Sequence, residues 1–400
     1  MKNYWMLLAV FFTVLQSCSV QTPKKSVDGL EMAVKMADSE MKHFPEPWAV
    51  DFNPKPTWNY TQGLIAQSMM KVWKENGNEA YYNYAKWYAD KMIDSIGFLS
   101  AYKIENYNID AVNSGKFLFD LYENTKDERY LKVIHQMRDQ LKEQPRTSEG
   151  GFWHKQRYPH QMWLDGLYMG APFYAQYAQY FNEPELFDDV VKQFQLVHKY
   201  TYNAETGLNY HAWDESKEQR WADPVTGCSP HYWGRAMGWY AMALVDVLDF
   251  IPQEHSGRAD ILKILNQVAE GIKKYQDKET GLWYQVLDQG SREGNYLEST
   301  ASSMFTYSLL KAVRKGYISS DYKNVTTKAY NGIVENLIKD NGDGTISLTQ
   351  CCSVAGLGGD PYRDGSYEYY ISEPIRDNDP KGVGPFIMAS LEFHKQMTPL

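Results

Sequence analysis

Asp165 is the residue of this chain whose surroundings most clearly suggest chemistry. It lies in the run HQMWLDGLYMGAPF, residues 160–173, where most of its neighbours are large apolar side chains. A carboxylate is poorly solvated in such a setting, so the charged form is disfavoured and a protonated acid, able to donate a proton, is favoured. The alternative is structural, because an Asp near the start of a helix also serves as an N-cap or an ion-pair partner.

Three further polar residues interrupt apolar segments in a similar way. They are Asp110 in YNIDAVNSG, His211 in NYHAWDES and Arg235 in HYWGRAMGWY. Taken singly, His211 fits a hydrogen-bonded core histidine and Arg235 a structural ion pair. We expect each of them at the loop-to-helix junction of a different hairpin, and this recurrence predicts one shared site. If Asp110 lies close to Asp165, the two acids resist ionising together.

The elements that must position these residues are helices. Apolar residues recur with helical spacing and few β-branched runs in about twelve segments. These segments are residues 27–43, 59–76, 78–96, 107–124, 127–143, 162–181, 184–202, 230–250, 258–276, 296–315, 323–340 and 379–396.

A short signature recurs between alternate pairs of these helices. It is a turn glycine followed by apolar residues, as in GGFWH, TGLNYH, TGLWY and DGTIS, and it predicts short extended strands. One helical hairpin repeated around a ring would form an (α/α)6 barrel, which is the fold we predict. An open helical solenoid would give the same pattern. No Pro-, Gly- or Ser-rich linker divides the chain, so we expect a single domain over residues 27–400.

Composition narrows the classes of partner. The chain has 400 residues, of which 43% are apolar, and a net charge of -9 without the clustered Lys and Arg that bind phosphate backbones, so we expect no nucleic acid. Aromatic residues make up 15%, with 31 Tyr and 12 Trp. Rings beside abundant polar groups suit stacking against sugars, although most aromatic side chains of a large helical protein simply fill its core.

The first residues have the layout of an export signal. Lys2 precedes an apolar stretch that ends near Leu15, and the sequence LQSC follows, which resembles a bacterial lipobox ending at Cys18. We expect a signal peptide over residues 1–17, a lipid anchor on Cys18, a short tether over residues 18–26 and a location in the periplasm or at the outer membrane. Plain secretion is the alternative.

The remaining cysteines predict neither disulfides nor a metal site. Cys351 and Cys352 are adjacent and therefore rarely bridge each other, which leaves no disulfide framework with Cys228. No CxxC or HExxH pattern is present, and we expect no bound metal.

Several longer motifs carry a family resemblance. MWLDGLYMGAPFYAQYA, YHAWDES, HYWGRAMGWYAMALVDVLD and the C-terminal GLGGDPYRDGSYEYYISEPIRDNDPKGVGPF occur in the order found in glycoside hydrolase family 105, the unsaturated rhamnogalacturonyl hydrolases. The chain resembles this family over nearly all of its length beyond the signal. The resemblance implies an (α/α)6 barrel that removes a Δ4,5-unsaturated uronic acid from the non-reducing end of oligosaccharides left by polysaccharide lyases.

The resemblance also implies roles for individual residues. Asp165 would protonate C4 of the sugar's enol-ether double bond, and water would then add at C5, whereas ordinary glycosidases use two carboxylates at the glycosidic bond. Asp110 would be the second acid, which binds sugar hydroxyls and tunes Asp165. The residues implied to hold the substrate are His211, Arg235, Trp163, Trp233, Trp239, Tyr60 and Lys381. No cofactor is implied, because protonation and water addition need neither a metal nor a redox group.

Two other functions remain open at this point. Unsaturated glucuronyl hydrolases share the barrel and the hydration chemistry but act on glycosaminoglycan, ulvan or arabinogalactan fragments. A non-catalytic lipoprotein that binds oligosaccharides on its aromatic residues would also fit the composition, but it would have no need for an acid in an apolar setting.

Overall fold

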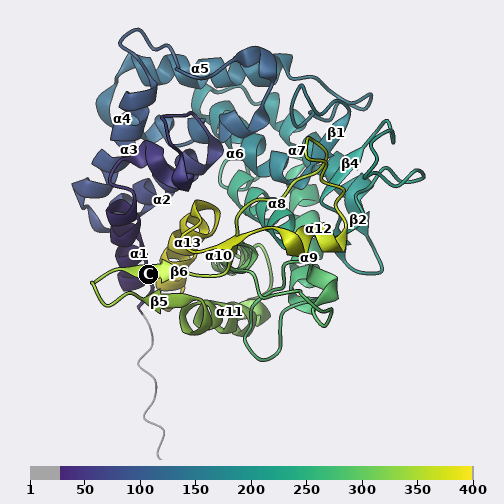
Figure 1. Ribbon diagram of the computed structural model, residues 1–400. Coiled ribbons are helices and arrows are strands. Elements are labelled where there is room, and N and C mark those ends of the chain that lie inside the picture. Colours follow the sequence, from purple (N-terminus) through teal and green to yellow (C-terminus); the bar gives the residue numbers. More distant parts are fainter. Residues whose placement is uncertain (1–27, 399–400) are drawn as a thin grey trace, which may run out of the picture.

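The structure of the protein is a computed structural model that describes residues 28–398, and it is a barrel of helices (Figure 1). The signal peptide, the tether and Cys18 predicted above lie outside the described residues. The helices are α1 (Gly29–His43), α2 (Tyr60–Asn76), α3 (Glu79–Met92), α4 (Leu118–Thr125), α5 (Glu128–Glu143), α6 (Leu164–Phe181), α7 (Leu186–Thr201), α8 (Gly234–Val247), α9 (Arg258–Lys274), α10 (Ser299–Arg314), α11 (Lys323–Asn336), α12 (Tyr367–Ser372) and α13 (Pro380–Met397).

Six helical segments form a closed inner ring. The 3-10 helix η3 (Ile109–Gly115), which continues into α4, packs between α2 and α6, and the ring proceeds through α8, α10 and α13 back to α2. Because α13 contacts α2, the ring is closed, and the open solenoid is excluded. The (α/α)6 barrel predicted from the sequence is therefore confirmed.

The outer helices explain why the inner ones run the same way. Outer helices α1, α3, α5, α7, α9 and α11 alternate along the chain with the inner segments, and α1, α3, α7 and α9 each pack against α13, α2, α6 and α8 respectively. Each outer helix returns the chain to the starting end, so all inner segments begin at one rim of the barrel. The inner helices are apolar almost all round, as the fully buried α8 illustrates.

One predicted helix is broken. Residues 107–124 form η3 and then α4 rather than one continuous helix. The Asn113 amide donates to the Tyr60 carbonyl at 2.9 Å, and the Ser114 hydroxyl donates to the Asn59 carbonyl at 2.6 Å. These side chains draw η3 tightly against the start of α2, where Gly63 leaves room for Ser114. The tight 3-10 turn holds Asp110 at the rim.

Short antiparallel strand pairs connect the hairpins at the rim. The strands are β1 (Gln161–Trp163), β2 (Tyr202–Asn203), β3 (Leu208–Asn209), β4 (Ala212–Asp214), β5 (Ile338–Asp340), β6 (Ile346–Leu348), β7 (Cys351–Cys352) and β8 (Ile375–Arg376). They pair as β1 with β4, β2 with β3, β5 with β6 and β7 with β8. Of the four glycine signatures, those at residues 206–211 and 343–347 lie at such strands, whereas those at 150–154 and 280–284 form only isolated bridges.

Candidate active site

The common rim collects most of the predicted site residues. Tyr60 is the first residue of α2, and Asp165, Arg235 and Lys381 are each the second residue of their helices α6, α8 and α13. Asp110 is the second residue of η3. Five of the six inner segments thus each place one predicted residue at the same end of the barrel.

His211 reaches the same rim by a different route. It lies between β3 and β4 rather than at a loop-to-helix junction, so that part of the prediction was wrong. β1 pairs with β4 in a register that sets Trp163 opposite Ala212, and the Leu164 amide donates to the His211 carbonyl at 3.0 Å. The strand pair, not a helix, therefore holds His211 beside the start of α6.

The starts of α6 and α8 lack side-chain caps. Their N-cap residues are Trp163 and Trp233, and neither accepts a hydrogen bond from its helix. The first amide of α6 instead donates to His211, and the Gly234 amide donates to the Gln285 carbonyl at 2.8 Å. The first amides of a helix are commonly capped by a Ser, Thr, Asp or Asn side chain. Because main-chain carbonyls take this role here, the side chains at these helix starts are left free for other contacts.

Asp165 and His211 form one cluster of chemically active groups at the rim. Asp165 Oδ2 lies 3.2 Å from His211 Nε2, but the approach lacks the alignment of a well-formed hydrogen bond. The His211 ring is fully buried, and its Nδ1 lies 2.8 Å from the Tyr370 hydroxyl. Burial above all, and the negative charge of Asp165 among other causes, raise the pKa of Tyr370 well above its usual range, so this hydroxyl stays protonated.

The Asp165–His211–Tyr370 row accommodates Asp165 either as a carboxylate or as a carboxylic acid. When Tyr370 donates to Nδ1, the Nε2–H faces the Asp165 carboxylate; when Nδ1–H donates to Tyr370, Nε2 faces an Asp165 that carries the proton. The second arrangement holds one proton more than the first, on Asp165, and has the other tautomer of His211. Asp165 is therefore placed to act as an acid in one arrangement and as a base in the other.

Asp110 belongs to a second cluster, with His154 and Lys155. Its Oδ1 lies 3.2 Å from His154 Nε2, and its Oδ2 lies 2.5 Å from Lys155 Nζ. Burial alone would raise the pKa of the Asp110 carboxyl, but the charges of Lys155 and His154 and their hydrogen bonds outweigh it and hold the pKa well below its usual range. Asp110 is therefore ionised at neutral pH.

Aromatic stacking joins the two clusters. The Trp163 ring stacks on His154 with a centroid distance of 4.8 Å and an interplanar angle of 5°, and it meets His211 edge-on at 5.2 Å. The row Asp110, His154, Trp163, His211 and Asp165 is thus continuous, which brings both predicted acids to one part of the rim.

The other predicted aromatic residues lie deeper. Trp233 is 1% exposed and packs against His211 and Tyr370, and Trp239 is 1% exposed and stacks on Tyr168 at 4.8 Å. Tyr60 is only partly buried and meets the edge of Trp239 at 6.2 Å. Trp233 and Trp239 therefore form the floor beneath the rim, and neither offers an open face to a ligand.

Tyr60 lies among the charged residues of the rim. Burial, then the negative charges of Asp51 and Asp110, raise the pKa of its hydroxyl well above the usual range, while Arg235 opposes them. The hydroxyl is therefore protonated and available as a hydrogen-bond donor.

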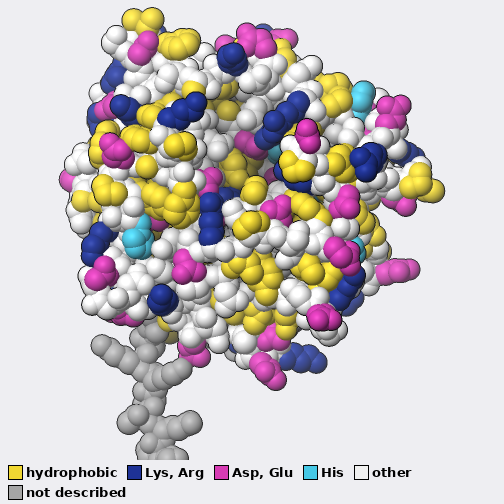
Figure 2. Space-filling model, viewed as in Figure 1, with side chains coloured by type: hydrophobic (Ala, Val, Ile, Leu, Met, Phe, Trp, Pro, Cys, Tyr) yellow, Lys and Arg dark blue, Asp and Glu magenta, His cyan; other side chains and the backbone are white. Residues whose placement is uncertain are grey.

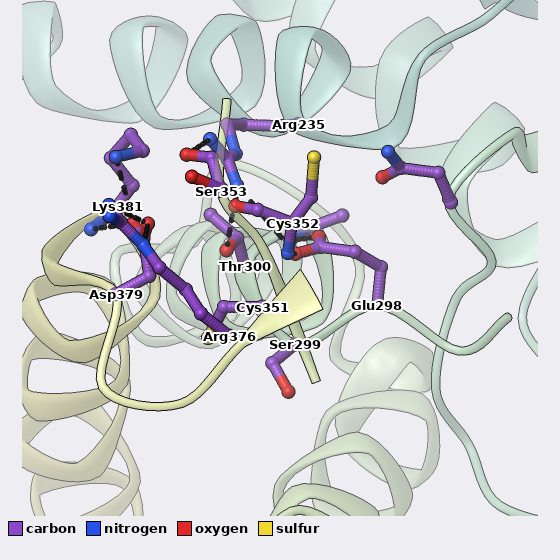
Figure 3. Close-up of polar contacts among 12 residues, drawn as sticks. Arg235, Glu298, Ser299, Thr300, Cys351, Cys352, Ser353, Arg376, Asp379 and Lys381 are labelled. Carbon is purple, nitrogen blue, oxygen red and sulfur yellow. Dashed lines mark hydrogen bonds and ion pairs between the residues drawn. The ribbon is translucent and has the colours of Figure 1, made fainter. Parts of the chain in front are cut away.

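Arg235 is held by the barrel itself (Figure 3). Its guanidinium donates to the carbonyl oxygens of Cys352 and Ser353 and to the Thr300 hydroxyl, and Glu298 Oε1 lies 3.9 Å away. The side chain is 1% exposed, and its Nε has no partner. A two-point contact of this guanidinium with a substrate carboxylate would require its nitrogens to give up their present acceptors.

Lys381 also has internal partners (Figure 3). Its Nζ lies 3.0 Å from Asp379 Oδ1 and 3.3 Å from Asp51 Oδ1, and Arg376 contacts both of these acids. Burial would raise the pKa of Asp379, but Lys381, Arg235 and Arg376 together hold it below its usual range. Lys381 is therefore part of a buried charge network that extends to Arg235.

Sequence reasoning missed several residues of the site. His154 was seen only as the end of a strand signature, and Lys155, Tyr370 and Glu298 were not singled out. His154 and Lys155 directly follow the aromatic pair of GGFWHK, a polar pair that could have drawn attention. Tyr370 gave no signal, because its contact with His211 spans 159 positions of the chain.

Charges of both signs are mixed with apolar side chains on the face shown in Figure 2. No group of three or more His, Cys, Asp or Glu in residues 28–398 is arranged to hold a metal ion. Cys228, Cys351 and Cys352 are buried free thiols. Over the same residues, no helix is both long and apolar enough to cross a membrane.

Comparisons with known proteins identify the family and agree with the fold. The model of Glycosyl Hydrolase Family 88 matches residues 32–397. A solved family 105 glycoside hydrolase from Clostridium acetobutylicum ("C. acetobutylicum ATCC 824") is 45% identical, with a TM-score of 0.87 over 91% of this chain and 99% of that one.

Two further relatives have lower sequence identity to this chain. The unsaturated rhamnogalacturonyl hydrolase YesR of Bacillus subtilis is 25% identical over 78% of this chain and 84% of its own length. The unsaturated glucuronyl hydrolase of Bacillus sp. GL1 shares the fold, with a TM-score of 0.68 and 15% identity over 92% of this chain and 97% of that one.

Proposed function

Since the chain belongs to the glycosyl hydrolase family 88/105 group and is an unsaturated uronyl hydrolase, we propose that its substrates are rhamnogalacturonan fragments. On this proposal it removes a Δ4,5-unsaturated galacturonyl residue from the non-reducing end. The match with the Bacillus subtilis unsaturated rhamnogalacturonyl hydrolase, which extends over most of both chains, supports this substrate class.

The observation that carries the mechanism is the contact of Asp165 with His211, backed by Tyr370. Asp165 donates its proton to C4 of the unsaturated sugar, and positive charge develops at C5 and the ring oxygen. Water adds at C5 and returns a proton to Asp165. The resulting hemiketal opens to a C5 ketone, and C1 releases the remaining oligosaccharide as an alcohol, so that one water is consumed in total.

The other rim groups fit supporting roles. Ionised Asp110, held by Lys155, is an acceptor for sugar hydroxyls, and its negative charge favours positive charge developing nearby. Tyr60 is a neutral donor at the same rim. The Arg235 Nε is unpaired but buried, so its contact with the uronate carboxylate would require the side chain to move.

A polar cavity of about 340 Å³ adjoins Lys155 and offers space for the next sugars. It is lined by Asn106, Asn108, Lys155, Gln156 and Arg157. Amides and cations suit hydroxyls and carboxylates of a further acidic sugar. Because Lys155 touches both this cavity and Asp110, the leaving part of the oligosaccharide would extend from the acids into it.

The test follows the ultraviolet absorbance of the conjugated enol-ether carboxylate, which hydration destroys. Purified protein is mixed with lyase digests of rhamnogalacturonan, ulvan and a glycosaminoglycan in parallel. We expect the absorbance to fall fastest with the rhamnogalacturonan digest. A faster loss with either of the other digests would replace the proposed substrate class with that of the unsaturated glucuronyl hydrolases.

Asp165→Asn tests the proton donor, with Asp139→Asn on the exposed face of α5 as the matched control. General acid catalysis contributes about 10²- to 10⁴-fold, so we expect a loss of that order in kcat for Asp165→Asn, with substrate binding retained by calorimetry. Near-normal turnover would refute the assignment. Binding of every digest without turnover in the wild type would instead favour a non-catalytic oligosaccharide-binding protein.

Export with a lipid anchor on Cys18 is a separate part of the proposal, supported only by the LQSC sequence after the apolar stretch. In cells fed a labelled fatty acid, we expect label on the wild-type protein and none on Cys18→Ala. Unlabelled wild-type protein recovered outside the cytoplasm would indicate plain secretion.

A further inference from the structure

A second cavity lies at the end of the barrel opposite the active site. It has a volume of about 390 Å³. Its lining comes from five of the six inner segments, including Gln67 and Lys71 of α2, Lys116 between η3 and α4, Gln176 of α6 and Tyr307 of α10, and from Phe250 beyond the end of α8. The volume is within the range of small-molecule sites.

Most charged groups around this cavity are paired. Lys74 lies 2.6 Å from Asp120, and Lys395 lies 2.9 Å from Glu75. Deeper in the barrel, Lys311 contacts both Asp246 and Asp249 at 2.6 Å, and Arg314 binds Glu392 through two nitrogens. The carboxylates named here, which line or surround the cavity, are therefore already paired with other cations.

Two lysines that line the cavity have no carboxylate partner. Lys71 makes no hydrogen bond or ion pair with any residue in the described part of the chain. Lys116 is 3% exposed, and its Nζ has only a long 3.5 Å contact with the Tyr168 carbonyl and the face of the Tyr168 ring, 3.6 Å from its centroid. The Lys116 ammonium is thus largely desolvated, Lys71 is partly buried, and neither has a carboxylate in contact, which is unfavourable.

The pKa of Lys116 reflects this burial without a carboxylate in contact. Burial lowers its pKa to about 7, Asp246 opposes this, and the charges of Lys71 and Lys311 lower it further. Burial also lowers the pKa of Lys71, with Lys311 acting in the same direction. An added negative charge between the two lysines would relieve both the desolvation and their mutual repulsion.

Helix dipoles do not account for this arrangement. Cations are favoured in the last turn of a helix, and Lys74 occupies that place in α2. Lys71 lies before this last turn, and Lys116 precedes the first residue of α4. The carbonyl that Lys116 contacts belongs to Tyr168, which is near the start of α6.

We propose that this cavity binds a small oxyanion between the ammonium groups of Lys71 and Lys116. Two ammonium groups can neutralise a phosphate or a dicarboxylate through charge-assisted hydrogen bonds. Gln67 and Gln176 line the same cavity, and the buried side-chain oxygen of Gln67 has no partner, so an amide turned to present its nitrogen would add a donor.

Isothermal titration calorimetry of the full chain tests the proposal, with inorganic phosphate and malonate as separate probes at constant ionic strength in sodium chloride. We expect saturable binding of at least one probe to a single site. Phosphate alone, malonate alone, or both would identify which oxyanion chemistry the cavity accepts. No saturable binding of either probe would overturn the proposal.

Three variants locate the site. We expect Lys71→Gln and Lys116→Gln each to weaken binding at least tenfold, whereas Lys74→Gln, in the same cavity but paired with Asp120, weakens it less than threefold. Equal effects of all three would indicate nonspecific charge attraction and refute the assignment. Because Lys71 is only partly buried, its variant is expected to fold even if Lys116→Gln does not, and an unchanged affinity in folded Lys71→Gln would also refute it.

Discussion

Replacing Tyr370 by Phe removes one hydroxyl from the row that ends at Asp165. The hydroxyl lies 2.8 Å from Nδ1 of His211, whose side chain is fully buried, so in the variant no water replaces it. An unsatisfied buried polar group costs about 1–3 kcal/mol, and the freed ring can also adopt the wrong tautomer or orientation. If this energy stabilises the transition state but not the bound substrate, its loss lowers kcat about 5- to 150-fold.

The matched control is the neighbouring Tyr369→Phe. The Tyr369 hydroxyl accepts from the Gly356 amide at 3.0 Å, so this variant also loses one hydrogen bond of α12, but not one that reaches His211. Initial rates of ultraviolet absorbance loss give kcat, and urea unfolding gives stability. We expect both variants to be destabilised and only Tyr370→Phe to lose kcat. Equal kcat losses in the two, or none in Tyr370→Phe, would refute a role of Tyr370 in positioning His211.

Three other perturbations test the packing and charges described above. Lys155→Met removes the cation that lies 2.5 Å from buried Asp110. Urea unfolding should therefore show that the free energy of unfolding falls by about 3 kcal/mol, and Lys155→Arg should largely restore it. An unaltered unfolding midpoint in Lys155→Met would contradict the pairing. Burial, then Asp379 and Asp51, raise the pKa of Glu40 to about 8, so the folded state binds more protons than the unfolded state from about pH 4.5 to 8. The free energy of unfolding therefore falls as pH rises through this window, by up to about 5 kcal/mol; Glu40→Gln should flatten this slope in pH-dependent unfolding, whereas the exposed Glu31→Gln should not. A Cβ on Gly63 would lie 2.5 Å from the Cα of Ser114, so Gly63→Ala should separate α2 from η3. We expect thermal melts to show that the free energy of unfolding falls by about 1–3 kcal/mol. An unshifted melting temperature would argue against this close contact.

The barrel was predictable because its signal is local and repeated. The apolar spacing of α2, α6 and α9 marks each helix to within a few residues of its observed start and end. The break between η3 and α4 was not visible, because it arises from Asn113 and Ser114 binding the backbone of α2, a contact between residues more than fifty positions apart. Closure of the ring likewise depends on α13 meeting α2.

The site was predictable where ring geometry alone positions a residue. Asp110, Asp165 and Arg235 reach one rim because each begins an inner segment. Their partners were not predictable, since Lys155 and Tyr370 are joined to them through the tertiary structure. The sequence likewise did not reveal that the Arg235 guanidinium is bound by main-chain carbonyls of β7 and Ser353, because main-chain acceptors leave no trace in residue type.

The contact of α13 with α1, α2 and α10 bears on how the chain matures. The chain is made N-terminus first, so α1 and α2 are made before α13, the helix that covers their apolar faces in the closed ring. Until α13 packs between α2 and α10, the barrel has an open seam of apolar side chains. The same helix carries Lys381. Closure of the barrel and completion of the rim are therefore one event.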